Sequence, residues 1–169
     1  MCGTPGAGAL YVTPRLIAHL TPELRGWFSQ PDPFNWDITN FAYALDIRRF
    51  DSGTPGVMAA LASVPALDWH AGQDRDAMVA HNRRLTARLI DAADDLGLAL
   101  ATPRPEAARG GSVMIALPDS LPADQVVARL RSEGITTDRR GQTLRLSPGV
   151  MTTETGVERL VAALGRIVG

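Results

Sequence analysis

The residues best suited to hold an anion form the run Arg48-Arg49-Phe50-Asp51-Ser52-Gly53-Thr54-Pro55-Gly56. A hydroxyl, a glycine and backbone amides converge here at the start of a predicted helix, and the positive end of a helix dipole favours a negative charge. Capping of that helix by Ser52 or Thr54 explains the same residues equally well. The two interpretations do not exclude each other, and both stay open at this point.

A second candidate is Arg145, in the apolar frame Leu144-Arg145-Leu146-Ser147-Pro148. Alternate side chains of a strand point to opposite faces, so an arginine between two buried leucines faces solvent or a carboxylate. A bidentate contact between guanidinium and carboxylate is the natural way to clamp an amino-acid substrate. Exposed strand arginines are common, however, so an ordinary surface position remains the alternative.

Other reactive residue types do not form a recognisable site. The glycine-rich run of residues 3–8 precedes a predicted strand instead of a helix, so we interpret it as a tight structural turn, with a phosphate contact as the alternative. The three histidines lack the spacing of metal ligands, and there is no Gly-x-Ser-x-Gly elbow. A single cysteine, Cys2, excludes an internal disulfide and is compatible with a reducing cytoplasm.

The composition narrows the class of protein. All 17 basic side chains among the 169 residues are arginine, because the chain has no lysine. A net charge of −1 does not indicate the positively charged surface that binding to nucleic acid or to an anionic membrane requires. Neither a signal peptide nor a run of 18 apolar residues is present, so we expect a cytoplasmic protein with no nucleic-acid or membrane partner.

The elements that must position these residues differ between the two halves of the chain. In the first half we expect a strand at 9–12, a helix from Pro14, loops to about Gly53, and a helix from 57 that Pro65 kinks or divides. In the second half, Asp74 and Gly97 bound a helix. Two strands follow, at 98–101 and 112–117, and then a short helix that ends at Gly134. The next two strands are expected at 135–137 and 143–146, joined by a turn at 138–141, and the last helix begins at 152 or 153. This order predicts a small α+β sandwich with helices on one face of the sheet.

The aromatic residues are concentrated in the first half. Three Trp, two Tyr and four Phe are present, and all but Trp69 precede residue 51. Each large ring removes about 150–250 Å² from water when buried, yet residues 21–56 are rich in turn formers and offer little scaffold. We therefore favour another domain or subunit as their packing partner; a loop that covers the C-terminal domain is the alternative.

Together these motifs resemble the C-terminal part of class V aminotransferase-family enzymes, which have fold type I and depend on pyridoxal phosphate. The closest branch is similar to kynureninase. The resemblance rests on residues 2–12, Gly26-Trp27-Phe28, residues 48–55, 110–113 and 144–148, which span nearly the whole chain. It implies an α/β fold: residues 1–56 as the C-terminal remnant of the large cofactor-binding domain, and residues 57–169 as a small C-terminal α+β domain.

The resemblance also implies roles for individual residues. Trp27 and Thr54 match residues that contact the cofactor phosphate across a dimer interface, and Arg145 matches the residue that binds the substrate carboxylate. The lysine that forms the Schiff base with the cofactor lies, in the family, just upstream of the stretch that begins at Cys2. No catalytic residue is assigned to this chain, because the lysine is absent from it. No metal ligand is assigned either, because the histidines lack the spacing of a metal site.

The expected function is therefore that of a C-terminal fragment of an amino-acid-converting enzyme, an aminotransferase or a kynureninase-type hydrolase, inactive alone. Its partners would be the amino-acid substrate and either a second copy, as a homodimer, or the missing large domain. The alternative is a non-catalytic binding or dimerisation module that lends Trp27 and Thr54 to a lysine-bearing partner chain.

Overall fold

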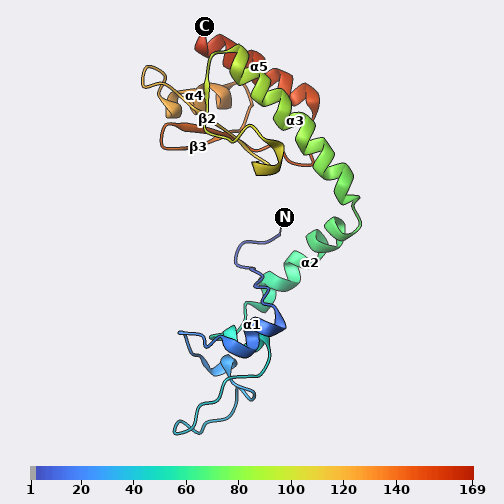
Figure 1. Cartoon of the computed structure of the whole chain (residues 1–169), viewed down its shortest axis with the longest axis vertical. Coiled ribbons are helices and arrows are strands. Elements are labelled where there is room, and N and C mark those ends of the chain that lie inside the picture. The colour runs from blue at the N-terminus through green and yellow to red at the C-terminus, as the bar shows by residue number, and fades with distance from the viewer. Residues whose placement is uncertain (1–2) are drawn as a thin grey trace. The chain divides into compact units, whose positions relative to one another are not determined.

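The computed structural model describes residues 3–169 and divides them into two compact units, one ending at Gln73 and one comprising Asp74–Gly169 (Figure 1). Cys2 lies outside the described residues. The domain boundary expected after residue 56 falls inside the first unit, directly before helix α2 (Val57–Ala71). That assignment to a large and a small domain stays a prediction.

The first unit consists mainly of loops. Its regular elements are α1 (Pro14–His19), two 3₁₀ helices, η1 (Trp27–Ser29) and η2 (Ile47–Phe50), and α2. The helix expected from Pro14 is confirmed, with the proline at its start, where the missing N–H costs nothing. The strand expected at residues 9–12 is wrong. The described part of this unit contains no strand, so the segment has nothing to pair with.

Helix α2 is continuous through Pro65, so the helix is not divided there, and a kink at Pro65, the other expected outcome, stays a prediction. A proline removes one backbone donor and clashes with the preceding turn. Around it the helix is open to solvent: Leu61 is 60 % exposed and Val64 43 %, so water can reach the backbone there. The first unit thus leaves much of the apolar surface of α2 uncovered.

The second unit is built on a four-stranded antiparallel sheet in the order β1-β2-β4-β3. The strands are β1 (Ala99–Leu100), β2 (Val113–Ala116), β3 (Asp138–Arg140) and β4 (Thr143–Leu146), and the short 3₁₀ helix η3 (Glu106–Ala108) precedes β2. Helices α3 (Arg75–Asp95), α4 (Ala123–Ser132) and α5 (Glu154–Val168) pack on it (Figure 1). This is the predicted helix-on-sheet arrangement.

Helix boundaries in this unit follow the local sequence signals. The Asp74 carboxylate accepts hydrogen bonds from two backbone amides at the start of α3, at 2.9 and 3.0 Å. Gly97, after the end of α3, has φ +65°, a conformation that favours glycine. The Thr153 hydroxyl accepts from the amide of Gly156 at 3.0 Å and caps α5. These predicted helix ends are confirmed.

The hairpin before α5 differs from the prediction. Residues 138–140 form strand β3 itself, and not the turn, because Arg140 pairs with Thr143 and only Gly141 and Gln142 connect the strands. Gly141 has φ +57°, which two-residue hairpin turns require. The expected strand at 135–137 is therefore wrong by about one strand length, and the shift places Asp138 opposite Arg145.

One apolar core holds the second unit together. It joins side chains of α3, α4 and α5 to those of the sheet that point toward them, including Val113, Ile115, Leu144 and Leu146, each at most 3 % exposed. Alternation along β2 and β4 places the residues between them on the opposite face of the sheet. Among the residues that the structure describes, no helix is both long and apolar enough to cross a membrane.

Candidate functional site

Arg145 lies on the sheet face opposite the core, as its position between two buried leucines predicts. On β4 it is directly opposite Met114 of β2 on one side and Asp138 of β3 on the other. Its side chain is 38 % exposed, and its Nη2 donates to Asp138 Oδ2 at 2.5 Å. Arg145 therefore meets a carboxylate, one of the two surroundings expected from the sequence.

The Asp138 carboxylate also accepts from the backbone amide of Arg139 at 2.6 Å and from Nη1 of Arg140 at 2.8 Å. Desolvation raises the pKa of Asp138, but the Arg139 amide and the charges of Arg140 and Arg145 outweigh it, so the pKa is lowered. Asp138 is consequently ionised at neutral pH and serves as a fixed negative charge between two guanidinium groups.

One donor of Arg145 has no partner. Its Nε is buried and makes no hydrogen bond, although buried donors are normally paired. An unpaired buried donor is costly, and an added carboxylate is the acceptor that a guanidinium prefers. Arg49 and Arg109 have the same unpaired Nε, so this atom alone does not distinguish Arg145. The 38 % exposure of its side chain leaves part of the guanidinium open to a carboxylate ligand.

Trp27 lies in η1 and is 38 % exposed. Its ring packs edge-to-face on Phe28, with centroids 4.8 Å apart, and on Phe34, 5.8 Å apart. The turn is tied to the segment before α2: Phe28 N donates to Ser52 O at 3.4 Å, and the buried Ser29 hydroxyl donates to Asp51 O.

Gly26 permits that contact, because a Cβ at this position would lie 1.6 Å from Ser52 O. The Gly-Trp-Phe turn and the segment leading to Thr54 are therefore adjacent within the first unit, although Trp27 and Thr54 are 27 positions apart in the sequence. Arg145 belongs to the second unit. The structure thus brings two of the three predicted site residues into neighbouring segments.

Thr54 is exposed and lies just before α2. The N-cap of α2 is Gly56, with no side-chain hydrogen bond to the first turn. The alternative that Ser52 or Thr54 caps this helix is therefore wrong. The positive end of the α2 dipole is left without a capping side chain, beside the exposed threonine.

Residues 3–8 form a turn, as the structural interpretation of this run predicts. Gly6 has φ +93°, and the amide of Thr4 donates to the Ser63 hydroxyl at 3.1 Å. This amide is thus used to attach the turn to α2.

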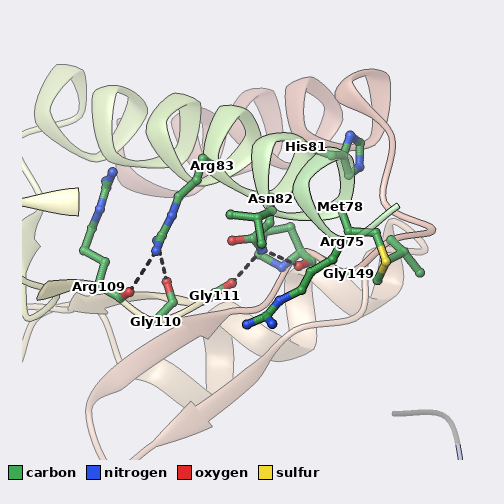
Figure 2. Close-up of a pocket in the computed structure, with 12 residues that line it drawn as sticks. Arg75, Met78, His81, Asn82, Arg83, Arg109, Gly110, Gly111 and Gly149 are labelled. Atoms are coloured by element: carbon green, nitrogen blue, oxygen red, sulfur yellow. Dashed lines mark hydrogen bonds between the residues drawn. The ribbon is translucent and has the colours of Figure 1, made fainter. Parts of the chain in front are cut away.

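A cavity of about 360 Å³ lies in the second unit between the first half of α3 and the loops at 109–111 and 148–150 (Figure 2). Asn82 Nδ2 donates to Gly111 O at 3.0 Å and to Pro148 O at 2.9 Å, and Arg83 donates to the carbonyls of Arg109 and Gly110. The side chains of Asn82 and Arg83 are thus engaged in holding two loops, as the dashed lines in Figure 2 show. No motif in the sequence marks this cavity.

The histidines are dispersed. His81 makes a hydrogen bond with Thr152 O through Nε2 at 2.8 Å, which ties α3 to the start of α5. Within residues 3–169, no three or more histidine, cysteine or acidic side chains are grouped as a metal ion would require.

Comparison with known proteins shows the family to which the chain belongs. The family model described as aminotransferase class-V matches residues 1–160. A kynureninase of Deinococcus radiodurans is 36 % identical over 143 residues, covering 82 % of this chain and 34 % of the relative. YcbU of Bacillus subtilis, described as an uncharacterized aminotransferase, is 31 % identical over 160 residues, covering 91 % and 39 %. The chain thus spans little more than a third of the length of these curated relatives.

Solved structures show the same fold. The apo cysteine desulfurase of Thermococcus onnurineus NA1 matches with a TM-score of 0.78 and 19 % identity, covering 94 % of this chain and 42 % of that one. The K223A mutant of C-DES, with glycine covalently linked to its pyridoxal-phosphate cofactor, matches with a TM-score of 0.74 and 17 % identity, covering 93 % and 41 %. The expected C-terminal part of an α/β pyridoxal-phosphate enzyme fold is confirmed.

Proposed function

The chain belongs to the aminotransferase class-V family, and we propose that it is the C-terminal portion of a pyridoxal-phosphate-dependent enzyme that acts on an amino acid. The observation that carries this proposal is Arg145, a half-buried guanidinium on the sheet face opposite the core, between the buried Leu144 and Leu146. Its matching position in the family binds the substrate carboxylate.

The chain's own residues fit the non-covalent part of a cofactor site. The exposed Thr54 precedes a helix start without a capping side chain, where the dipole favours a phosphate. Trp27 lies on the turn attached to the same segment. When bound, pyridoxal phosphate supplies an electron sink for bonds at the amino acid's α-carbon. The chain cannot attach it covalently, because it has no lysine.

Arg145 would orient the substrate through its carboxylate. A guanidinium offers parallel donors that fix both the position and the plane of a carboxylate. Such fixing of a reactant in the right geometry is itself a large part of catalysis. The role is one of binding and orientation, since an arginine stays protonated at neutral pH and cannot act as a base.

We expect the chain alone to be catalytically inactive. The missing lysine would come from further polypeptide, and the coverage of 34 to 39 % of the curated relatives supports this. We further propose that the complete enzyme is a dimer in the cytoplasm, with Trp27 and Thr54 facing the cofactor of the second subunit.

The DNA upstream of Met1 tests the proposal. An in-frame extension that encodes a lysine within a few codons, preceded by roughly two hundred family-like residues, would support it. The extended product should then retain pyridoxal phosphate on gel filtration, while the present chain should not. A stop codon with no family-like sequence beyond it would contradict a fragment of a single longer chain.

A non-catalytic module is the second candidate, favoured by the exposed rings of the first unit. Tyr11 is 84 % exposed, Phe34 65 % and Trp36 78 %, and such a surface requires a partner. In this case the chain would lend Trp27 and Thr54 to a lysine-bearing protein. Co-purification of the chain with a larger pyridoxal-phosphate protein would support this candidate, and its elution alone from native extracts would contradict it.

A further inference from the structure

We propose that Asp138 is a positioning residue for Arg145: it fixes the guanidinium on the open face of the sheet, so that the remaining donors meet a substrate carboxylate. This inference rests on the proposed function of Arg145. No motif of the sequence identifies Asp138 as part of the site.

The pair is built into the sheet. Asp138 and Arg145 are directly opposite each other on the antiparallel strands β3 and β4, so their side chains leave the same face. Asp138 Oδ2 accepts from Nη2 of Arg145 at 2.5 Å. A guanidinium has five N–H donors, and this contact uses one of them while the side chain stays 38 % exposed.

Asp138 does not cancel the charge of the site. Its carboxylate is shared with Nη1 of Arg140, at 2.8 Å from both oxygens, and with the backbone amide of Arg139. Two guanidinium groups against one carboxylate leave the cluster with a net positive charge. An incoming carboxylate is therefore still attracted, and the saturated Asp138 is held in place by contacts other than Arg145.

Fixing the guanidinium in advance favours binding. A free arginine side chain loses conformational freedom when a ligand immobilises it, and this loss is subtracted from the affinity. The ion pair with Asp138 already immobilises the guanidinium in the folded protein, so ligand binding costs less conformational entropy. The consequence is that a carboxylate should bind more weakly, and the guanidinium should move more, when the Asp138 charge is removed.

The test compares Asp138→Asn with Asp94→Asn in the full chain. Asp94 is a matched control: it accepts from Arg104 at 2.7 and 2.8 Å, and its side chain is 42 % exposed, as is that of Asp138. In ¹⁵N-labelled protein, the Nε–H signal of Arg145 is assigned by its loss in Arg145→Lys. Its relaxation reports the mobility of the guanidinium, and acetate titrated at constant ionic strength reports carboxylate binding.

Asp138→Asn should increase the mobility of the Arg145 Nε–H and weaken acetate binding by about two- to fivefold, the range for an ion pair of this exposure. Asp94→Asn should match the unaltered chain, and Asp138→Glu should restore part of both readouts. Unchanged mobility in Asp138→Asn, or tighter acetate binding, would overturn the inference. If acetate leaves the Arg145 signal of the unaltered chain unchanged, the proposed substrate role fails, and the mobility comparison alone decides the role of Asp138.

Discussion

Replacing Gly26 by alanine should loosen the turn that carries Trp27. Gly26 has φ −148° and ψ 172°, an extended conformation that any residue adopts, so only steric contact opposes the change. An alanine Cβ would lie 1.6 Å from Ser52 O and 2.2 Å from its carbonyl carbon. The two backbone segments must separate by roughly 2 Å to reach ordinary contact.

That separation removes the contacts that join the turn to the segment before Thr54. Phe28 N and Ser52 O are already 3.4 Å apart, and the buried Ser29 hydroxyl would lose its acceptor, Asp51 O. We expect a loss of about 1–3 kcal/mol in the free energy of unfolding of the first unit, the usual range for overpacking.

Tryptophan fluorescence isolates this effect, because all three tryptophans lie in the first unit. The measurement is urea unfolding followed by fluorescence, with Gly53→Ala as the matched control. A Cβ at Gly53 meets nothing within 4 Å, so this variant carries the same change in the unfolded chain without the clash. Equal unfolding midpoints for the two variants would show that the close contact of Gly26 with Ser52 does not stabilise the first unit.

Three further predictions concern the second unit and are measured by far-UV circular dichroism during urea unfolding. Asp74→Ala removes the cap of α3 and should cost about 1 kcal/mol; an unchanged midpoint would count against the capping role. Leu144→Ala empties a fully buried position of the core and should cost about 2–5 kcal/mol, so a loss of only a few tenths would show that the position is not buried. The hydrogen bond from Arg88 holds the pKa of Glu158 below its usual 4.5, so the stability it adds is complete above pH 4.5 and is lost as the pH falls through the lower folded-state pKa. Glu158→Gln should therefore lose less stability on acidification, and parallel pH profiles for the two proteins would contradict this.

The sequence predicted those parts of the fold whose signals are local. Asp74, Gly97 and Thr153 mark helix ends by chemistry confined to one turn. The position of Arg145 opposite the core also followed from the leucines beside it, because strand alternation extends over only a few residues.

The errors involve the pairing of strands, which depends on a second segment of the chain. The polar run that contains Asp138 and ends in glycine predicts a turn, whereas pairing with Arg145 places Asp138 in a strand. Residues 9–12 have the composition of a strand but no strand to pair with in the described part of their unit. Asp138 is recognised only once the sheet places it directly opposite Arg145.

We propose that this chain contributes phosphate and carboxylate contacts to a cofactor site whose lysine belongs to other polypeptide. Equilibrium dialysis of pyridoxal phosphate against that lysine-bearing polypeptide, with and without this chain, tests it most directly. We predict tighter binding when the chain is present, and a partial loss of the gain with Thr54→Val. The same affinity with and without the chain would show that the chain does not contribute to the cofactor site.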